Sequence, residues 1–297
     1  MKSYRVITLD AFTNTPFAGN PCAVLPDADG LSDDQMQAIA RETNLPETSF
    51  VLKSSKADFR VRYFTPRHEI PFAGHPTIAT SFLLALEKRF PLHEPVTTIS
   101  LEFNIGVLPV DIKVENEKPV QAIMTQQLPS FGKQLGAFET APCFNLAVED
   151  LRSDAPVQVV STGAAFLIVP VVNVDILGKV KMDRDKLSDL LDKVGVGAAF
   201  MFSLGGFDKD VDTHARLLDP KGTFEDPFTG SAAGAMGAYI VHYGLKKGPF
   251  LHAEQGYFVR RPGRGTLEIT QLAGEITAVK LAGSAVMVME GNIYLQN

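Results

Sequence analysis

Cysteine is scarce in this sequence. The 297 residues include only two cysteines, Cys22 and Cys143, and neither has the paired spacing of metal ligands. No cluster of His, Cys or carboxylate residues has the spacing of a metal site either. Two separate thiols make no disulfide framework, and they indicate a reducing compartment. We therefore predict a protein without structural disulfides and without a bound metal.

Long hydrophobic runs and an excess of positive charge are also missing. No segment approaches the roughly 20 apolar residues that a membrane span requires. The chain begins with the strand-like segment MKSYRVITLDAF, whereas a secretory signal has a long apolar region behind a basic one. The formal charge of −6 argues against a nucleic-acid partner, because nonspecific affinity for phosphates comes from clustered Lys and Arg. These absences predict a soluble cytoplasmic protein that binds neither membranes nor nucleic acids.

The glycines do not form the usual phosphate-binding or hydrolase motifs. Gly19-Asn20 and Gly205-Gly206 make no dinucleotide fingerprint, and the sequence contains no phosphate loop. Ser231 follows a glycine, yet the segment FTGSAAG lacks the G-x-S-x-G spacing of a hydrolase elbow. Nucleotide-dependent chemistry and serine hydrolysis are therefore disfavoured.

The patterns that are present predict an α+β protein. A chain of 297 residues with 45% hydrophobic content is long enough for two domains, each with a core. Alternating strand patterns dominate the first half, most clearly at residues 59–64. One helix should begin at the capping box Ser32–Gln35, and a second should cover about residues 75–88. The second helix is apolar nearly all round, so we expect it to be buried inside a curled antiparallel sheet.

The second half of the chain repeats this plan. Strands, an amphipathic helix at residues 183–194 and a second apolar segment follow in the same order. A polar, Pro-containing stretch at residues 128–156 has weak periodicity and is the expected boundary. We place the lobes at residues 1–128 and 129–297, and we expect the last residues, 293–296, to cross back to the first lobe.

A motif that occurs twice supports the two-lobe arrangement. EIPFAGHP at residues 69–76 recurs 156 residues later as EDPFTGSA at residues 225–232, and RYFTP upstream recurs as RLLDP at a spacing of 154. A period of half the chain indicates two similar lobes. Gly74 and Gly230 each open a helix, where unpaired backbone N–H groups and the helix dipole favour an anion. If the lobes face each other, both helix starts could bind the carboxylate of one small substrate; otherwise the glycines merely permit close turns.

Four polar residues near these motifs have both a functional and a structural interpretation. His75, at the start of a buried helix, is expected to be neutral, either as a satisfied core residue or as a hydrogen-bonding group in a site. Asp226 and Ser231 could contact a substrate, or Asp226 could simply hold the turn before the helix. Glu47 could be an exposed residue at the start of a strand, or it could face a cleft and carry protons. The local sequence is compatible with either interpretation.

Six motifs together resemble a known family. The chain is similar to PhzF-type isomerases of the phenazine-biosynthesis family, which resemble diaminopimelate epimerase in fold. That resemblance implies an α+β fold of two pseudo-symmetric lobes, each a curled antiparallel sheet or barrel around a central helix, with the active site between them. It also implies a homodimer with no metal or organic cofactor. The motifs are LDAFT at 9–13, PFAGNP at 16–21, ETSF at 47–50, RYFTP at 62–66, AGHPT at 73–77 and EDPFTGSA at 225–232.

The same resemblance assigns roles to individual residues. Glu47 matches the acid/base glutamate that moves a proton between carbons, and Asp226 matches a polar residue that orients the substrate. The remaining matches hold the substrate or lie close to it, and they are Asn20, Gly74, His75, Gly230 and Ser231. We therefore predict Glu47, His75 and Asp226 as the catalytic residues and the others as substrate-binding residues.

Departures from the relatives narrow the predicted chemistry. Related epimerases place two thiols around the substrate carbon, and Ala73 and Thr229 stand at those positions here. A single shuttling carboxylate suits an isomerase that removes and returns a proton on one face of a small carboxylate-bearing metabolite. Pro46 precedes Glu47 where relatives often have a hydroxyl residue, which argues against the phenazine substrate, a dihydro-hydroxyanthranilate. A thiol-type racemase of an amino-acid-like substrate, using Cys22 or Cys143, and a catalytically silent binding protein are the alternatives.

Overall fold

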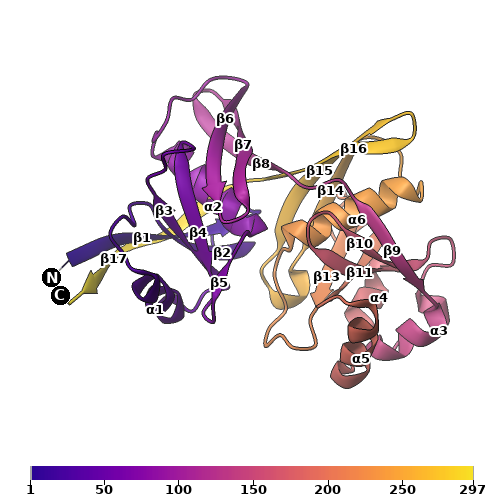
Figure 1. Ribbon diagram of the computed structural model, residues 1–297. Coiled ribbons are helices and arrows are strands. Elements are labelled where there is room, and N and C mark those ends of the chain that lie inside the picture. Colours follow the sequence, from indigo (N-terminus) through magenta and orange to yellow (C-terminus); the bar gives the residue numbers. More distant parts are fainter. Residues whose placement is uncertain (1, 297) are drawn as a thin grey trace. The chain divides into compact units, whose positions relative to one another are not determined.

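The computed structural model describes residues 2–296 and divides the chain into two compact units (Figure 1). The first unit ends at Thr125 and takes in the chain again from Ala282, whereas Gln126–Leu281 form the second unit. We predicted the boundary three residues later, after residue 128. Gln126 belongs to the second unit because its backbone N–H donates to the Val279 carbonyl at 2.8 Å and its side-chain Nε2 donates to the Gly230 carbonyl at 2.9 Å.

The first unit is a mostly antiparallel sheet. From one edge, its long strands follow the order β17, β1, β2, β3, β4, β6, β7, β8, and Figure 1 shows β17 beside β1. The β2–β3 and β4–β6 pairings are parallel, because a crossover containing α1 or α2 joins the two strands of each pair. The elements are β1 (Lys2–Ala11), β2 (Asn20–Leu25), α1 (Asp33–Thr43), β3 (Glu47–Leu52), β4 (Phe59–Phe64), β5 (Glu69–Ile70), α2 (Gly74–Leu86), β6 (Val96–Phe103), β7 (Gly106–Glu115), β8 (Lys118–Thr125) and β17 (Ala285–Leu295).

Helix α2 lies at the centre of the first unit. It contacts β17 and β1 near one edge of the strand order and β7 and β8 near the other, so the sheet curls around it. Every residue from His75 to Ala85 is buried, as its nearly uniform apolar character predicts. The predicted central helix is thereby confirmed.

Helix α1 covers the outer face of the same sheet. The Ser32 hydroxyl accepts from the Gln35 backbone N–H at 3.2 Å, and the Gln35 side chain accepts from the Ser32 N–H at 2.9 Å. This is the predicted capping box. Met36 and Ile39 of α1 then pack against Phe50 of β3.

The second unit repeats this architecture. Strands β9 to β15 pair in sequence order, with β11–β12 and β13–β14 parallel. Helix α6 contacts one face, and α4, α5 and η1 cover the other (Figure 1). The elements are β9 (Ser130–Leu135), α3 (Ala137–Thr140), η1 (Ala141–Phe144), η2 (Val148–Asp150), β10 (Val157–Ser161), β11 (Ala165–Val171), α4 (Val174–Lys179), α5 (Arg184–Val194), β12 (Ala199–Leu204), β13 (Thr213–Leu218), α6 (Gly230–His242), β14 (Phe250–Gln255), η3 (Tyr257–Val259), β15 (Gly263–Leu272) and β16 (Glu275–Gly283).

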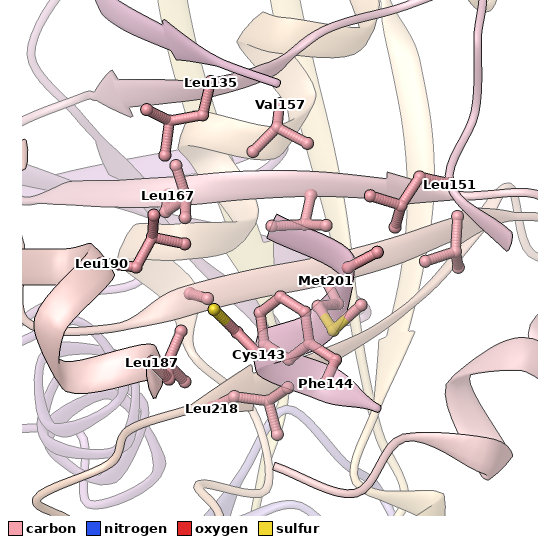
Figure 2. Packing of buried hydrophobic residues seen from close by; sticks show 14 of the residues in the cluster. Leu135, Cys143, Phe144, Leu151, Val157, Leu167, Leu187, Leu190, Met201 and Leu218 are labelled. Carbon is pink, nitrogen blue, oxygen red and sulfur yellow. The ribbon is translucent and has the colours of Figure 1, made fainter. Parts of the chain in front are cut away.

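A hydrophobic cluster fills the space between α5 and the sheet of the second unit. Leu187 and Leu190 of α5 pack with Leu167 and Met201 of the strands, and Figure 2 shows Cys143 among them. Because the amphipathic pattern of α5 places its leucines on one face, this helix was predictable. Among residues 2–296, no helix is both long and apolar enough to cross a membrane.

Candidate active site

The repeated motif forms the same ion-pair clamp in each unit. Arg62 binds Glu69 through two bonds of 2.7 Å, Nε to Oε1 and Nη2 to Oε2. Arg216 binds Glu225 in the same way, with Nε–Oε1 at 3.0 Å and Nη2–Oε2 at 2.7 Å. Two parallel bonds fix both distance and orientation. Each clamp therefore anchors the segment that leads into α2 or α6.

Both helices start without a side-chain cap. The N-cap residues are Ala73, with φ −151° and ψ 145°, and Thr229, with φ −102° and ψ 91°, and neither side chain caps the helix. Gly74 and Gly230 are the first helical residues. The first N–H groups of a helix have no partner within the helix, so both starts present donors to an anion.

Glu47 and His75 meet in the first unit. Glu47 is the first residue of β3 and His75 the second of α2, and Glu47 Oε2 lies 3.2 Å from His75 Nε2. Their side chains are 20% and 8% exposed, so Glu47 is largely withdrawn from solvent. Glu47 is therefore not the exposed glutamate that the sequence also allowed.

Burial keeps His75 neutral. It lowers the pKa of His75 from 6.5 to about 3, and a hydrogen bond to the Pro21 backbone acts in the opposite direction. Proline has no backbone N–H, so its carbonyl oxygen accepts this hydrogen bond and the imidazole donates it. Nε2, the nitrogen that faces Glu47, has no hydrogen-bond partner of its own, which assigns the donated proton to Nδ1.

This tautomer determines how many protons the pair holds. A neutral imidazole protonated at Nδ1 presents the lone pair of Nε2 to the Glu47 carboxyl oxygen, 3.2 Å away. Two lone pairs at that distance repel, whereas a proton between them makes a hydrogen bond. Glu47 and His75 are therefore best satisfied when they share one proton.

Asn20 lies at the start of β2, close in the chain to the Pro21 carbonyl that accepts from His75. It is fully buried, and Pro21 pairs with Asp10 across β1 and β2. Asp10, 1% exposed, accepts from the Phe17 N–H at 2.7 Å and so holds the loop before Asn20. The predicted residues Asn20, Gly74, His75 and Glu47 thus all belong to the first unit.

Neither cysteine has the environment of a catalytic thiolate. Cys22 is fully buried next to Glu47 in the β2–β3 register, and burial raises its pKa well above the usual value. Burial also raises the pKa of Cys143, which lies in the α5 core and donates to the Glu139 carbonyl at 3.6 Å. Because the thiolate is the reactive form, these environments argue against the thiol-type racemase.

Asp226, Gly230 and Ser231 belong to the second unit, where a glutamine organises the start of α6. The Thr229 hydroxyl donates to Asp226 Oδ2 at 2.5 Å. Gln255, 1% exposed, accepts from the Thr229 N–H at 3.0 Å and donates to the Asp226 carbonyl at 2.7 Å. Gln255 was not predicted from the sequence, because a lone polar residue in a strand carries no local signal. The Thr229 hydroxyl and the Gln255 amide thus fix the carboxylate and the carbonyl of Asp226 in the turn before α6.

A second buried pair was also missed. His214 Nδ1 lies 2.8 Å from Glu254 Oε1, and both side chains are fully buried. The same carboxylate oxygen accepts from the Phe207 N–H at 2.5 Å, which ties the loop after β12 to β14. Among the described residues 2–296, no three His, Cys, Asp or Glu side chains are arranged to hold a metal ion.

Comparison with known proteins identifies the family. The model of the PhzC-PhzF family, described as phenazine biosynthesis-like protein, matches residues 9–291. An uncharacterized isomerase of Clostridium acetobutylicum is 33% identical over 305 residues, covering 99% of both chains. The trans-2,3-dihydro-3-hydroxyanthranilate isomerase of Pseudomonas aeruginosa is 31% identical over 296 residues, covering 98% of this chain and 100% of that one.

Solved structures agree with the sequence comparison. A PhzF-family phenazine biosynthesis protein of Bacillus anthracis has a TM-score of 0.90 and 35% identity, covering 99% of this chain and 100% of that one. A hydroxyproline epimerase of Agrobacterium vitis shares the fold, with a TM-score of 0.64 and 13% identity over 99% of this chain and 93% of that one. The chain therefore belongs to the PhzC-PhzF family of phenazine biosynthesis-like proteins and is an isomerase of that family.

Proposed function

We propose that this isomerase moves a proton between two carbons of a small carboxylate-bearing metabolite, with Glu47 as the acid/base. The observation that carries the proposal is the largely buried Glu47 carboxyl, 3.2 Å from Nε2 of a neutral His75. A carboxyl group in such a place is suited to proton transfer, because it is largely buried and has a second proton-binding group beside it.

The shared proton makes Glu47 both base and acid. In a sparsely populated state that proton lies on His75 Nε2, at an energetic cost that reflects the low pKa of His75, and Glu47 is then a carboxylate that can remove a proton from a substrate carbon. Glu47 then returns this proton to a second carbon, and the His75–Glu47 pair ends with the single proton it had at the start. The electron pair of the broken C–H bond moves through the π system of the substrate and forms the new C–H bond. One carboxyl group serves both steps, so the proton leaves and returns on the same face.

We also propose how the substrate is held. The backbone N–H groups of Gly74 and His75 point out of an uncapped helix start and would bind a carboxylate. Gly230 and Ser231 offer the same donors at the start of α6, and the ordered Asp226 carboxylate would orient a polar substituent. The negative charge that develops during proton removal is stabilised by such fixed donors.

Substitution of Glu47 tests the acid/base role. Glu47→Gln keeps the shape of the side chain and removes proton transfer, so we expect deuterium uptake from D₂O into substrate to fall at least about a hundredfold. The exposed Glu42→Gln is the matched control and should behave as wild type. Mass spectrometry of the substrate measures the exchange. Undiminished exchange in Glu47→Gln would remove Glu47 from the mechanism.

The substrate can be sought without a prior candidate. Metabolites retained by purified wild type and by Glu47→Gln should include one carboxylate compound enriched in both, because the substitution spares the binding groups. Trans-2,3-dihydro-3-hydroxyanthranilate, the compound named for the Pseudomonas aeruginosa relative, is the first test substrate. Pro46 stands before Glu47 in this chain, and rapid turnover of that compound would show that this departure is tolerated.

A further inference from the structure

A row of buried hydroxyl groups lies between β3, β4 and α2 in the first unit. The Thr80 hydroxyl donates to Ser49 Oγ at 2.7 Å. The Tyr63 hydroxyl lies 3.0 Å from Thr77 Oγ1, and Thr77 in turn donates to the Ala73 carbonyl at 2.6 Å. The Thr80 hydroxyl also lowers the pKa of the Tyr63 phenol against the larger effect of burial, so the two halves of the row adjoin. All four side chains are at most 1% exposed.

The row connects the two elements that carry the proposed proton-transfer pair. Ser49 stands two residues after Glu47 in β3, and Tyr63 is its direct neighbour in β4. At the other end, the bond from Thr77 reaches the N-cap residue Ala73, two residues before His75. The strand that carries Glu47 and the helix start that carries His75 are thus fastened to each other.

The second unit shows that the fold does not need these hydroxyls. Matching the helix starts Gly74 and Gly230 places Ala233 and Met236 at the positions of Thr77 and Thr80. Tyr63 follows the clamp arginine of the first unit directly, and Leu217 follows that of the second, so these two residues correspond. Across the strands, Tyr63 pairs with Ser49 and Leu217 pairs with Phe200, so Phe200 corresponds to Ser49. The corresponding positions are therefore apolar: Phe200, Leu217, Ala233 and Met236.

The same alignment shows that the hydroxyl row and the glutamate occur in the same unit. Phe200 matches Ser49, so the residue two positions earlier, Ala198, matches Glu47. The unit with the hydroxyl row has the acid/base glutamate, and the unit without the row has alanine in its place. Buried hydroxyls stabilise a fold little, because their hydrogen bonds mainly offset the loss of solvation. A fully bonded polar network does, however, specify one arrangement of the groups around it.

We propose that Ser49, Tyr63, Thr77 and Thr80 are positioning residues that hold Glu47 and His75 at hydrogen-bond distance. This inference rests on the proposed function, because the pair is the group that they position. The residues do not touch the substrate. Loss of one hydroxyl should misplace the pair and slow proton transfer while substrate binding is kept.

A set of Thr77 variants tests this role. Thr77→Val keeps the side-chain shape and removes the hydroxyl, and we expect kcat to fall at least about tenfold with KM within about twofold of wild type. Thr77→Ser restores the hydroxyl and should recover most of the activity. Thr140→Val is the matched control, because Thr140 is also fully buried and donates to the carbonyl four residues earlier, that of Gly136, at 2.9 Å.

A second readout does not depend on turnover. The ¹⁵N NMR signals of the His75 imidazole report whether Nε2 shares a proton with Glu47, and we expect them to change in Thr77→Val and return in Thr77→Ser. Tyr63→Phe should give the same spectral change, since it removes the donor to Thr77. Wild-type kcat together with an unchanged His75 spectrum in Thr77→Val and Tyr63→Phe overturns the inference. If wild type and Glu47→Gln are equally active, the proposed function fails, and the His75 spectra still decide whether the hydroxyl row positions the pair.

Discussion

At the scale of single residues, the structure brings two ambiguous side chains, Glu47 and His75, within 3.2 Å of each other. Glu47 is only 20% exposed and His75 only 8%; the apolar helix pattern predicted the burial of His75, whereas that of Glu47 does not follow from its own sequence context. They lie 28 positions apart in the chain and meet because β3 and the start of α2 lie side by side in the fold. The repeat could indicate His75 as a candidate site residue, because His75 lies in one of its copies. Glu47 lies outside both copies, so it could be identified as a candidate only through the family resemblance or the structure.

The protonation state of His75 is directly measurable. Burial lowers its pKa to about 3, so its imidazole should stay neutral through the range in which an ordinary histidine gains charge, near pH 6.5. The neutral form is the deprotonated one, and a lowered pKa extends it to lower pH. A ¹H–¹⁵N NMR titration from pH 8 to pH 4 follows this signal beside that of the exposed His68. A His75 signal that titrates near pH 6.5 would show that the ring is solvated.

At the scale of elements, the sequence predicted the helices whose signals lie within their own residues. The capping box at Ser32 and the all-round apolar character of α2 each specify a helix without reference to the rest of the chain. The parallel pairings of β2 with β3 and of β4 with β6 did not follow from the sequence, because strand alternation is the same in parallel and antiparallel neighbours. The hydroxyl row and Gln255 were missed for a related reason, since their partners lie on other elements.

The capping box predicts a measurable stability change. Ser32→Ala removes the acceptor of the Gln35 N–H, so we expect the free energy of unfolding of the first unit to fall by about 1 kcal/mol. The site lies on other elements, and turnover at moderate temperature should stay at the wild-type level. Urea denaturation followed by circular dichroism measures the change. An unaltered midpoint would mean that the exposed start of α1 is frayed.

The clamp before α2 predicts a functional change. Arg62→Lys replaces the two-bond fork to Glu69 with a single point charge, so the segment that leads to Ala73 and Gly74 loses its fixed orientation. We expect KM to rise several-fold, because the donors at the helix start shift. Arg5→Lys is the control, because it weakens ion pairs of β1 with Glu290 and with Glu87, which lies at the opposite end of α2 from Gly74. Equal KM values for the two variants and wild type would show that the clamp is not needed for binding.

At the scale of the whole molecule, two copies of one architecture have diverged. Both units retain the Arg–Glu clamp and the uncapped helix start, which are the features visible as a repeat in the sequence. The first unit has the glutamate and the hydroxyl row, and the second has Ala198 and apolar side chains at the corresponding positions. The repeat could predict the shared scaffold. It could not predict this difference, because the residues concerned lie outside the repeated motif or on its buried side.

The return of the chain to the first unit has a consequence for stability. β17 pairs with β1 along ten residues of that strand, from Lys2 to Ala11. Removal of the chain from Ala285 on leaves β1 as an open edge, and we expect amide protection to be lost in the first unit but kept in α5 and α6. Hydrogen exchange with mass spectrometry resolves the two units. Full protection of β1 and β2 after truncation would contradict the architecture.

The central claim is that one carboxyl group carries the proton between two carbons. A substrate found by metabolite retention, deuterated at the carbon that loses its proton, is converted for less than one turnover in light water, and the product is analysed by mass spectrometry. We expect part of the deuterium to appear at the new position in the wild-type product, because Glu47 returns the deuteron that it removed, and we expect Glu47→Gln to form almost no product. A wild-type product free of deuterium, together with undiminished product formation by Glu47→Gln, would contradict the central claim.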